Sequence, residues 1–522
     1  MPPHDDGQAP PPEGTGAVSV RCVQSQKGME ICIVDAAGGK RNLNRDQDEL
    51  LEKTLGRLRS SLAGKPKKKK KGATPDSPRE GGGDSAGLVI AILGGEGPEA
   101  APLDPTTVTN REAWSEGNTL KVGEALYPII VNSPTVLDVF VASRPMVGYP
   151  ILPVPEVEFC RPEDLEYTWL RVRAKPRSSS GSEGSKSPPP PSPPPGDREA
   201  EEVVAIGRCY TPSPRDVGHT LRVECSPPGA GPGRKFSAAV YGPVRKAPPR
   251  APALERLQFP RPAASGDGAV PFRVCTYNVL ADQYSHTWET LYPYFPRKFH
   301  TPNYRFQLAL EDIRILGADI VALQEVDAKW YDLFWRPHMA ASGYSGMYTC
   351  KADLGNSGKG SREGSALFIK DEAFEVVATR DLRPGKGLAT CSDPRMAELV
   401  SGLPNLAEIL DRITTVAQLA VLRPRAGGGG AGLLCVANTH LFFHPRATHV
   451  RMIQAAHVLH EAEKLGREAD ACGGAALVLC GDLNGEPQDG VIEFLKSGNV
   501  SAAHPEWAVA ASLGFRWFSP MK

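Results

Sequence analysis

The sequence has no net charge and no long apolar run. Its 522 residues include 60 Lys and Arg against 60 Asp and Glu, so no overall basic field attracts nucleic acid, although a local basic patch can still do so. No apolar stretch reaches the ~20 residues that a membrane-spanning helix needs, so we expect no membrane insertion. The first 14 residues contain no Arg and three acidic residues, which is untypical of a signal or transit peptide.

The chain also lacks any Cys-x-x-Cys pair or regular cysteine spacing. Several of its 11 cysteines lie in apolar runs, among them Cys275, Cys435 and Cys480. This pattern favours buried free thiols in a reducing compartment over disulfides. The 50 Pro and 53 Gly cluster along the chain, and the length suggests two to four domains, so we expect ordered domains joined by linkers.

The first half has the pattern of a β-rich module over residues 18–245, after a disordered start at 1–17. Alternating apolar residues around Gly28 predict a hairpin, and leucines at helical spacing predict a helix over 46–63. Short β-like runs from 87 to 245 predict an all-β sandwich. Low-complexity insertions interrupt the module at 65–86 and 178–196, and a Pro-rich linker follows at 246–269. The lysine run at 65–72 suits a solvated linker, a nuclear signal or an anion-binding tail.

Strand-like runs alternate with helical stretches after residue 270. Helices are expected over 303–316 and 447–466, and loops over 351–360 and 427–430. Such alternation is typical of an α/β domain, which we place at 270–522.

Polar side chains follow four of these apolar runs, at the point where each predicted strand ends. They are Asn278; Gln324, Glu325 and Asp327; Asn438 and His440; and Asp482 and Asn484. Ligands gather beyond strand ends in open α/β sheets. Oxygen-rich groups suit a hard cation such as Mg²⁺, whereas zinc normally takes more His or Cys. The joint pattern therefore predicts a magnesium site.

Each of these residues alone has an ordinary explanation: a solvated glutamate, a core histidine, asparagines that cap turns. An EF-hand starting at Asp482 would match at Asn484, Glu486 and Glu493. However, Pro487 stands where the sharp turn of that loop needs Gly, and an apolar strand precedes it instead of an amphipathic helix. We therefore reject the calcium interpretation.

Five motifs along this domain have the pattern of a known superfamily. They are TYNVLAD (276–282), LQEVD (323–327), SREGSALF (361–368), NTHLFFHP (438–445) and CGDLNGEP (480–487). With them the chain resembles the endonuclease/exonuclease/phosphatase superfamily. NTHLFFHP followed by Arg451-MIQAAHVL is similar to the subgroup with the cytoplasmic deadenylases, nocturnin and a mitochondrial 2′,5′-phosphodiesterase, which the β-rich leader resembles most. The resemblance implies a two-sheet α/β sandwich.

The resemblance also implies a role for each site residue. Glu325 matches the main metal ligand, and Asp482 and Asn484 match the pair that orients the attacking water and touches metal and phosphate. Asn278 matches a carboxamide near the metal, and His440 matches the imidazole that donates to the scissile phosphate. The implied substrate-binding residues are Asn438, Pro445 and Asn484. One or two Mg²⁺ ions are both compatible with this pattern.

These matches imply a Mg²⁺-dependent phosphodiesterase and 3′-exoribonuclease. Its expected substrates are 2′-5′ oligoadenylate or 3′ poly(A) of RNA rather than DNA, and its expected location is the mitochondrial matrix, otherwise the cytoplasm. Two alternatives remain: another phosphoesterase of the same fold, or a non-catalytic protein that binds RNA or partners.

The family pattern extends beyond Asn484, to an Asp in a late strand and a Ser-Asp-His motif. Here residues 489–508 still resemble the family, but His504 is the last histidine and is not in a Ser-Asp-His context. We therefore expect the last strands of the second sheet and the terminal His/Asp pair to be missing, as in a truncated and catalytically impaired form.

Overall fold

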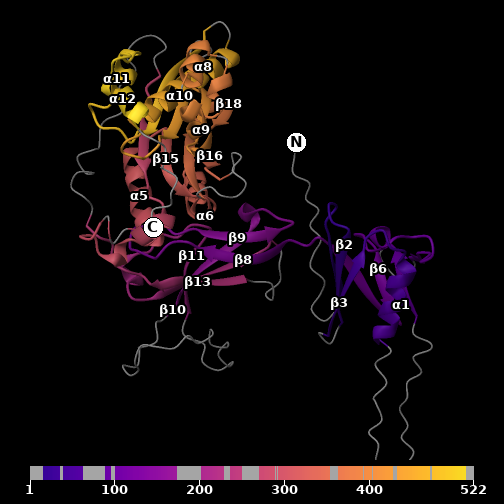
Figure 1. The fold of residues 1–522 in the computed structure, drawn as a ribbon. Coiled ribbons are helices and arrows are strands. Elements are labelled where there is room, and N and C mark those ends of the chain that lie inside the picture. Colours follow the sequence, from indigo (N-terminus) through magenta and orange to yellow (C-terminus); the bar gives the residue numbers. More distant parts are fainter. Residues whose placement is uncertain are drawn as a thin grey trace, which may run out of the picture.

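The computed structural model (Figure 1) gives the fold of most of the chain. It describes residues 16–35, 39–62, 89–95, 100–172, 201–228, 236–249, 270–287, 290, 292–352, 362–391, 393–402, 404–426, 432–470 and 473–512. The low-complexity tracts predicted at 65–86 and 178–196, most of the 246–269 linker, the 427–430 loop and the tail after 512 lie outside these residues. None of the described helices is both long and apolar enough to cross a membrane.

The first sheet has seven strands in the order β3-β2-β1-β7-β6-β4-β5. The strands are β1 Ala17–Cys22, β2 Gly28–Val34, β3 Lys40–Asp46, β4 Ile90–Gly94, β5 Ala101–Pro102, β6 Thr119–Val122 and β7 Ala125–Val131, with helices α1 Leu51–Leu62 and α2 Asn110–Ala113. The predicted hairpin is confirmed, since β1 pairs antiparallel with β2. The predicted helix begins five residues late, at Leu51, because residues up to Asp46 belong to β3.

The second β-rich unit has a core of its own. Its strands are β8 Thr135–Val141, β9 Pro153–Glu158, β10 Glu166–Val172, β11 Glu201–Ile206, β12 Thr220–Ser226 and β13 Phe236–Pro243. The pair β8-β9 and the sheet β11-β10-β12-β13 share a cluster of buried apolar side chains that includes Val139 and Trp169. The first sheet surrounds a separate cluster with Leu51 and Leu55 of α1. The strands of residues 18–245 thus gather around two cores, and the domain boundaries remain a proposal.

A buried carboxylate ties this second unit together. Asp216 is fully buried and accepts hydrogen bonds from Arg171 Nε (2.8 Å), Tyr210 OH (2.7 Å), and the backbone N–H and hydroxyl of Ser213 (2.6 and 2.8 Å). Burial works against the charged form, but these hydrogen bonds outweigh it and hold the pKa of Asp216 below its ordinary value. The carboxylate therefore stabilises the fold only while it is ionised.

Asp216→Asn is expected to lower the local unfolding free energy by about 3 kcal/mol at pH 7, because it weakens a buried charged network. A depressed folded-state pKa gives stability that is complete above the unfolded value of about 4 and is lost as the pH falls through the folded value. The difference between variant and wild type should therefore shrink in acid. The urea dependence of hydrogen exchange in β10 and β12, at neutral and acidic pH, measures it.

Asp164→Asn is the matched control. Asp164 also accepts from an arginine, Arg161, and from a backbone N–H, but it is exposed, so its replacement should cost less than about 1 kcal/mol. Equal losses for the two variants would contradict the argument from burial.

The α/β domain contains two four-stranded mixed sheets, as the fold class predicts. One has the order β14-β15-β17-β16 and the other β18-β19-β20-β21. The strands are β14 Val274–Asn278, β15 Ile320–Asp327, β16 Tyr344–Cys350, β17 Glu363–Lys370, β18 Phe374–Leu382, β19 Ala417–Pro424, β20 Leu433–His440 and β21 Ala475–Asp482. The α-helices are α5 Pro302–Leu316, α6 Ala328–Trp330, α7 Arg336–Ala340, α8 Pro394–Ser401, α9 Pro404–Arg412, α10 Thr448–Ala469, α11 Gly490–Ser497 and α12 Pro505–Ser512, with a π-helical turn at Tyr331–Trp335.

The two sheets pack face to face because their central strands are apolar on both sides. On β15, Ile320 and Ala322 join Leu434 and Val436 of β20 in the core between the sheets. The intervening residues of β15 face α5 and the π-helical turn, and those of β20 face α10. Runs that are buried on both faces are typical of such central strands. The order of layers is therefore helices, sheet, sheet, helices.

Hydrogen bonds join the second β-rich unit to the α/β domain. Arg144 donates its backbone N–H to Asn303 O (3.0 Å), and Gln307 Nε2 donates to Arg144 O (2.8 Å). Ala142 also lies in the apolar cluster around α5. The loop after β8 thus docks on α5.

Candidate active site

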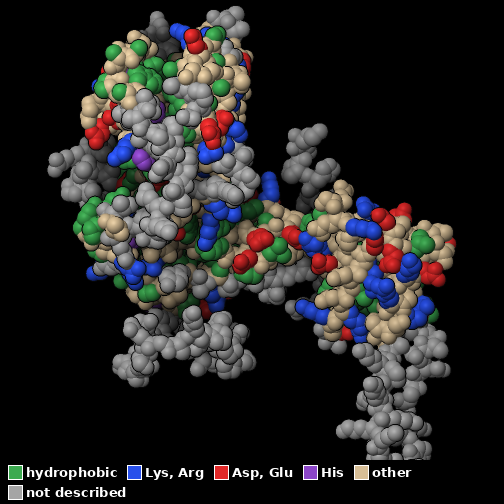
Figure 2. All heavy atoms as spheres, viewed as in Figure 1, with side chains coloured by type: hydrophobic (Ala, Val, Ile, Leu, Met, Phe, Trp, Pro, Cys, Tyr) green, Lys and Arg blue, Asp and Glu red, His purple; other side chains and the backbone are tan. Residues whose placement is uncertain are grey.

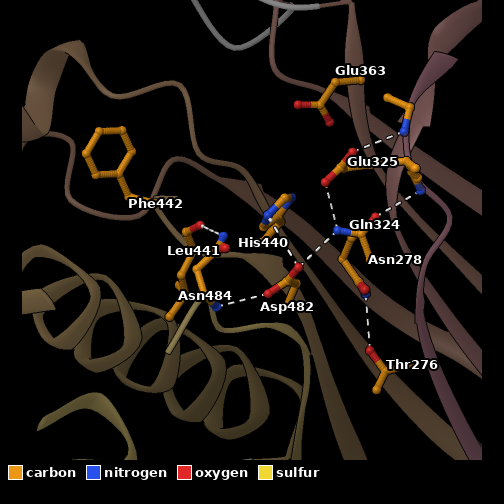
Figure 3. Close-up of polar contacts among 12 residues, drawn as sticks. Thr276, Asn278, Gln324, Glu325, Glu363, His440, Leu441, Phe442, Asp482 and Asn484 are labelled. Carbon is orange, nitrogen blue, oxygen red and sulfur yellow. Dashed lines mark hydrogen bonds and ion pairs between the residues drawn. The ribbon is translucent and has the colours of Figure 1, made fainter. Parts of the chain in front are cut away.

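Four strands end at one place between the two sheets. Asn278 is the last residue of β14, Glu325 lies near the end of β15, and His440 and Asp482 end β20 and β21. The pairs β14–β15 and β20–β21 are parallel, with Asn278 opposite Gln324 and His440 opposite Asp482. Parallel pairing brings the ends within each sheet together, and face-to-face packing brings the two sheets together. The predicted residues therefore converge (Figure 3).

One carboxamide joins carboxylates from the two sheets. Asn278 Nδ2 donates to Glu325 Oε1 at 2.8 Å and to Asp482 Oδ2 at 2.9 Å. Its own oxygen accepts the backbone N–H of Leu280 at 3.0 Å, which fixes the orientation of the amide. Two negative charges are thus held close together by a single donor.

A bulge in β15 turns Glu325 toward this point. The pairing of β15 with β17 shifts register between Gln324 and Val326, and Glu325 has φ +56°. Such a left-handed backbone costs free energy in a residue with a side chain, and bulges of this kind re-aim side chains beside functional sites. Ala281 N–H then donates to Glu325 Oε2 at 3.0 Å. The strained residue is held in place by its neighbours.

The loop after β21 presents Asp482 and Asn484. Asp482 Oδ1 accepts the backbone N–H of Asn484 (2.9 Å), and Asn484 Nδ2 donates to Leu441 O (2.8 Å). Gly481 precedes them at φ +145°, where an added Cβ would lie 1.9 Å from Thr439 O. The glycine is therefore required by the close approach of β20, and the turn chemistry and the polar site coincide.

His440 lies beside Asp482. Its Nε2 is 3.7 Å from Asp482 Oδ2, and the residue is 8% exposed. Burial and the nearby Lys351 ammonium lower the pKa of His440, against the opposing effect of Asp482 and Glu325. The lowered pKa favours the neutral imidazole at pH 7.

Thr276, Asn278, Gln324 and residues 481–486 line a cleft of about 420 Å³. The predicted substrate contact Pro445 is not among these lining residues; it lies exposed in the loop after β20, and its role remains a proposal.

Asn438 was predicted to bind substrate, but its buried position argues against direct contact. It is 0% exposed and accepts from Gln324 Nε2 at 2.9 Å. Its Nδ2 donates to the backbone oxygens of Leu323 and Ala366 and to Gln418 Oε1. This amide network joins the two sheets through Gln324, the residue before Glu325, so Asn438 supports the site from within.

Asn438→Leu is expected to lower the unfolding free energy of the α/β domain by about 3 kcal/mol, because it leaves buried amides and carbonyls without partners. Urea denaturation measures the change. Thr439→Val, on the same strand, removes a single hydrogen bond to Val416 O and should cost about 1 kcal/mol. A smaller loss for Asn438→Leu than for Thr439→Val would contradict the proposed network.

Two comparisons with known proteins bear on this geometry. The model of the Endonuclease/Exonuclease/phosphatase family matches residues 275–521. The 2′,5′-phosphodiesterase 12 of Bos taurus is 30% identical over 525 residues, which cover 94% of this chain and 79% of that protein. The chain belongs to the endonuclease/exonuclease/phosphatase family. This is a family of phosphoesterases and nucleases whose members generally use divalent metal ions.

Two further similarities cover less of the chain. Carbon catabolite repressor protein 4 homolog 2 of Arabidopsis thaliana is 28% identical over 328 residues, which cover 59% of this chain and 53% of that protein. A solved structure of ANGEL2, described as a 2′,3′-cyclic phosphatase in complex with adenosine-2′,3′-vanadate, is 26% identical and covers 44% of this chain and 57% of that chain. Its TM-score is 0.35.

The donor groups of this family member fit a hard divalent cation. Among the described residues, no three His, Cys, Asp or Glu side chains form a metal-binding group. The acidic groups that could hold a cation here are the two carboxylates that Asn278 bridges, Glu325 and Asp482. Asn484 uses its Nδ2 on Leu441, which leaves Oδ1 for ligation. Mg²⁺ is usually bound by one or two carboxylates while waters and substrate phosphates complete its shell. This oxygen set therefore fits Mg²⁺ better than Zn²⁺.

Glu363 and Lys351 also face this region, although no role was predicted for either residue. Glu363 is fully buried at the start of β17 and accepts from Lys351 Nζ and from Tyr284 OH (3.2 Å). Burial, with a smaller contribution from Glu325, raises the pKa of Glu363, although Lys351 opposes the shift. The only sequence signal was the motif SREGSALF, in which one glutamate at a strand start is not distinctive.

Proposed function

We propose that the protein is a Mg²⁺-dependent phosphodiesterase that acts as a 3′-exoribonuclease on 2′-5′ oligoadenylate or on 3′ poly(A). The observation that supports it best is the pair of carboxylates, Glu325 and Asp482, bridged by Asn278 beside a neutral His440. The names of the relatives, a 2′,5′-phosphodiesterase and a carbon catabolite repressor protein 4 homolog, support the substrate class. The proposal includes a location in the mitochondrial matrix, on the resemblance given above.

Each residue has a defined part in the proposed reaction. When bound, Mg²⁺ supplies Lewis-acid polarisation of the scissile phosphate, and Glu325 with Asp482 and Asn484 would hold it. Asp482 orients the attacking water, since one of its oxygens is fixed by Asn484 and the other by Asn278. His440 Nε2–H donates to a phosphate oxygen and stabilises its developing charge. Asn278 holds the carboxylates of Glu325 and Asp482 in a fixed relative position by donating to both.

The test is hydrolysis by the purified full-length chain. Trimers of adenylate with 2′-5′ or 3′-5′ linkages, and a 3′-5′ uridylate trimer as control, are incubated with Mg²⁺ or with EDTA, and the released nucleotides are separated by chromatography. We expect Mg²⁺-dependent release of AMP from at least one adenylate trimer and little UMP. Absence of release from every trimer would contradict the proposed enzyme, and equal use of uridylate would contradict the adenylate specificity.

A further inference from the structure

The segments that follow β20 and β21 run side by side next to the cleft. Leu441 donates its backbone N–H to Asp482 O (2.9 Å), and its carbonyl accepts from Asn484 Nδ2 (2.8 Å). The first segment, residues 441–446, leaves the strand that ends in His440. The second, residues 483–489, carries Asn484 and leads into α11. Their relative position therefore determines where Asn484 lies with respect to His440.

Two side chains of α10 form hydrogen bonds with the backbone of the first segment. Gln454 Oε1 accepts the Phe442 N–H at 3.0 Å, and Arg451 Nη1 donates to the carbonyls of His444 (2.9 Å) and Phe442 (3.4 Å). Arg451 and Gln454 are three residues apart and so share one face of the helix. Both backbone groups of Phe442 are thus fixed by side chains, which is unusual for a loop.

Arg451 also reaches the second segment. Its Nη2 donates to Asp489 Oδ2 at 3.2 Å, and the same oxygen accepts the backbone N–H of Glu486 at 3.1 Å. One guanidinium therefore joins both segments to α10. The planar fork of arginine suits such a three-way contact, whereas the point charge of lysine does not.

The cation is buried, which makes a role in stability alone a poor explanation. Arg451 is 2% exposed, and the Asp489 side chain is 14% exposed. A buried ion pair costs desolvation that its attraction only partly offsets, and apolar residues of similar volume often stabilise a fold as well or better. What an apolar side chain cannot do is fix two loops in one geometry.

We propose that Arg451, with Gln454 and Asp489, forms a clamp that holds the 441–446 and 483–489 segments at a fixed separation, and that Arg451 is thereby a positioning residue for the nucleotide bound beside His440 and Asn484. This inference rests on the proposed phosphodiesterase function. Ordering both segments before substrate arrives reduces the entropy lost on binding. A displacement of about 1 Å in such a wall lowers rates by up to about 100-fold.

Arg451→Met tests the clamp. We expect kcat/KM on the adenylate trimer to fall about 10- to 100-fold. The Mg²⁺ concentration for half-maximal rate should rise less than it does in Glu325→Gln, because Arg451 contacts neither Glu325 nor Asp482 and only Asn484 lies on a loosened segment. Hydrogen exchange should rise in 441–446 and 483–489 together and remain unchanged in β15. Arg451→Lys should recover part of the rate, since it keeps the charge that pairs with Asp489.

Asp489→Asn is the second variant, because it removes the ion pair but keeps an acceptor for Glu486 N–H, and it should loosen the same two segments. Arg380→Met is the matched control: Arg380 pairs with Glu461 and Glu468 of the same helix, away from the cleft loops. A kcat/KM for Arg451→Met within twofold of that control, or faster exchange throughout the domain, would overturn the clamp. If the wild type hydrolyses no trimer, the proposed function is wrong, and the exchange data alone decide on the clamp.

Discussion

Glu325→Gln is expected to lower kcat/KM for Mg²⁺-dependent hydrolysis by about 10³-fold. Glutamine keeps the shape of the side chain and an acceptor for Ala281 N–H but removes the charge that a hard cation needs. A catalytic metal contributes several kcal/mol to stabilising the transition state, and each ~1.4 kcal/mol corresponds to tenfold in rate. The large effect therefore follows from the loss of one charge.

The measurement is initial rate against Mg²⁺ concentration for wild type and variant. Loss of a ligand should shift the half-maximal Mg²⁺ concentration upward as well as lower the rate. Glu375→Gln is the control. Glu375 is an exposed glutamate on β18 that pairs with Arg423, so its replacement removes the same charge away from the cleft and should leave both the rate and the half-maximal Mg²⁺ concentration unaltered. A Glu325→Gln enzyme with wild-type Mg²⁺ dependence would show that Glu325 is not a ligand.

The convergence of the site residues could be predicted because strand ends are visible in the sequence. Asn278, Glu325, His440 and Asp482 each come at the end of an apolar run, and buried central strands produce such runs. Parallel pairing then leaves one place for them to meet. The bulge that aims Glu325 was not visible, because it depends on pairing with β17, a strand that enters the sheet from 40 residues further along the chain.

How deeply a strand residue lies between the two sheets was also not visible in the sequence. Asn438 and His440 are two residues apart on β20 and so point to the same face, but Asn438 lies about 7 Å deeper between the sheets. His440 lies beside Asp482, which lines the cleft, whereas Asn438 is buried in the amide network. Both are polar residues near the end of an apolar run, so their residue types alone did not distinguish them.

Edge strands were missed for a related reason. β3 and β18 were not predicted, and each lies at the edge of its sheet. Their sequences, KRNLNRD and FEVVATRDL, are mostly polar or half-exposed. Strands with one open edge need fewer apolar residues, so the alternation that identified the central strands is weak here. The Arg451–Asp489 contact could not be predicted for another reason: it joins residues that are 38 positions apart in the sequence.

His440 should affect the rate through a different property from Glu325. Its imidazole is buried, burial lowers its pKa, and its Nε2 lies 3.7 Å from Asp482 Oδ2, so in the proposed reaction it acts as a hydrogen-bond donor rather than as a metal ligand. A donor fixed before the reaction stabilises charge that develops on the phosphate in the transition state more than charge in the ground state. Its removal should therefore lower kcat and leave metal binding intact.

His440→Leu is accordingly expected to lower kcat by about 10²- to 10³-fold. Its half-maximal Mg²⁺ concentration should stay unchanged, whereas that of Glu325→Gln should rise. His440→Gln, which restores an N–H near the position of Nε2, should recover part of the loss. His449→Leu is the control, since His449 is also buried, in α10, and neither of its ring nitrogens has a hydrogen-bond partner among the described residues. If His440→Leu shifted the Mg²⁺ dependence, or if His440→Gln were no faster than His440→Leu, the imidazole would not be acting as a donor to the phosphate.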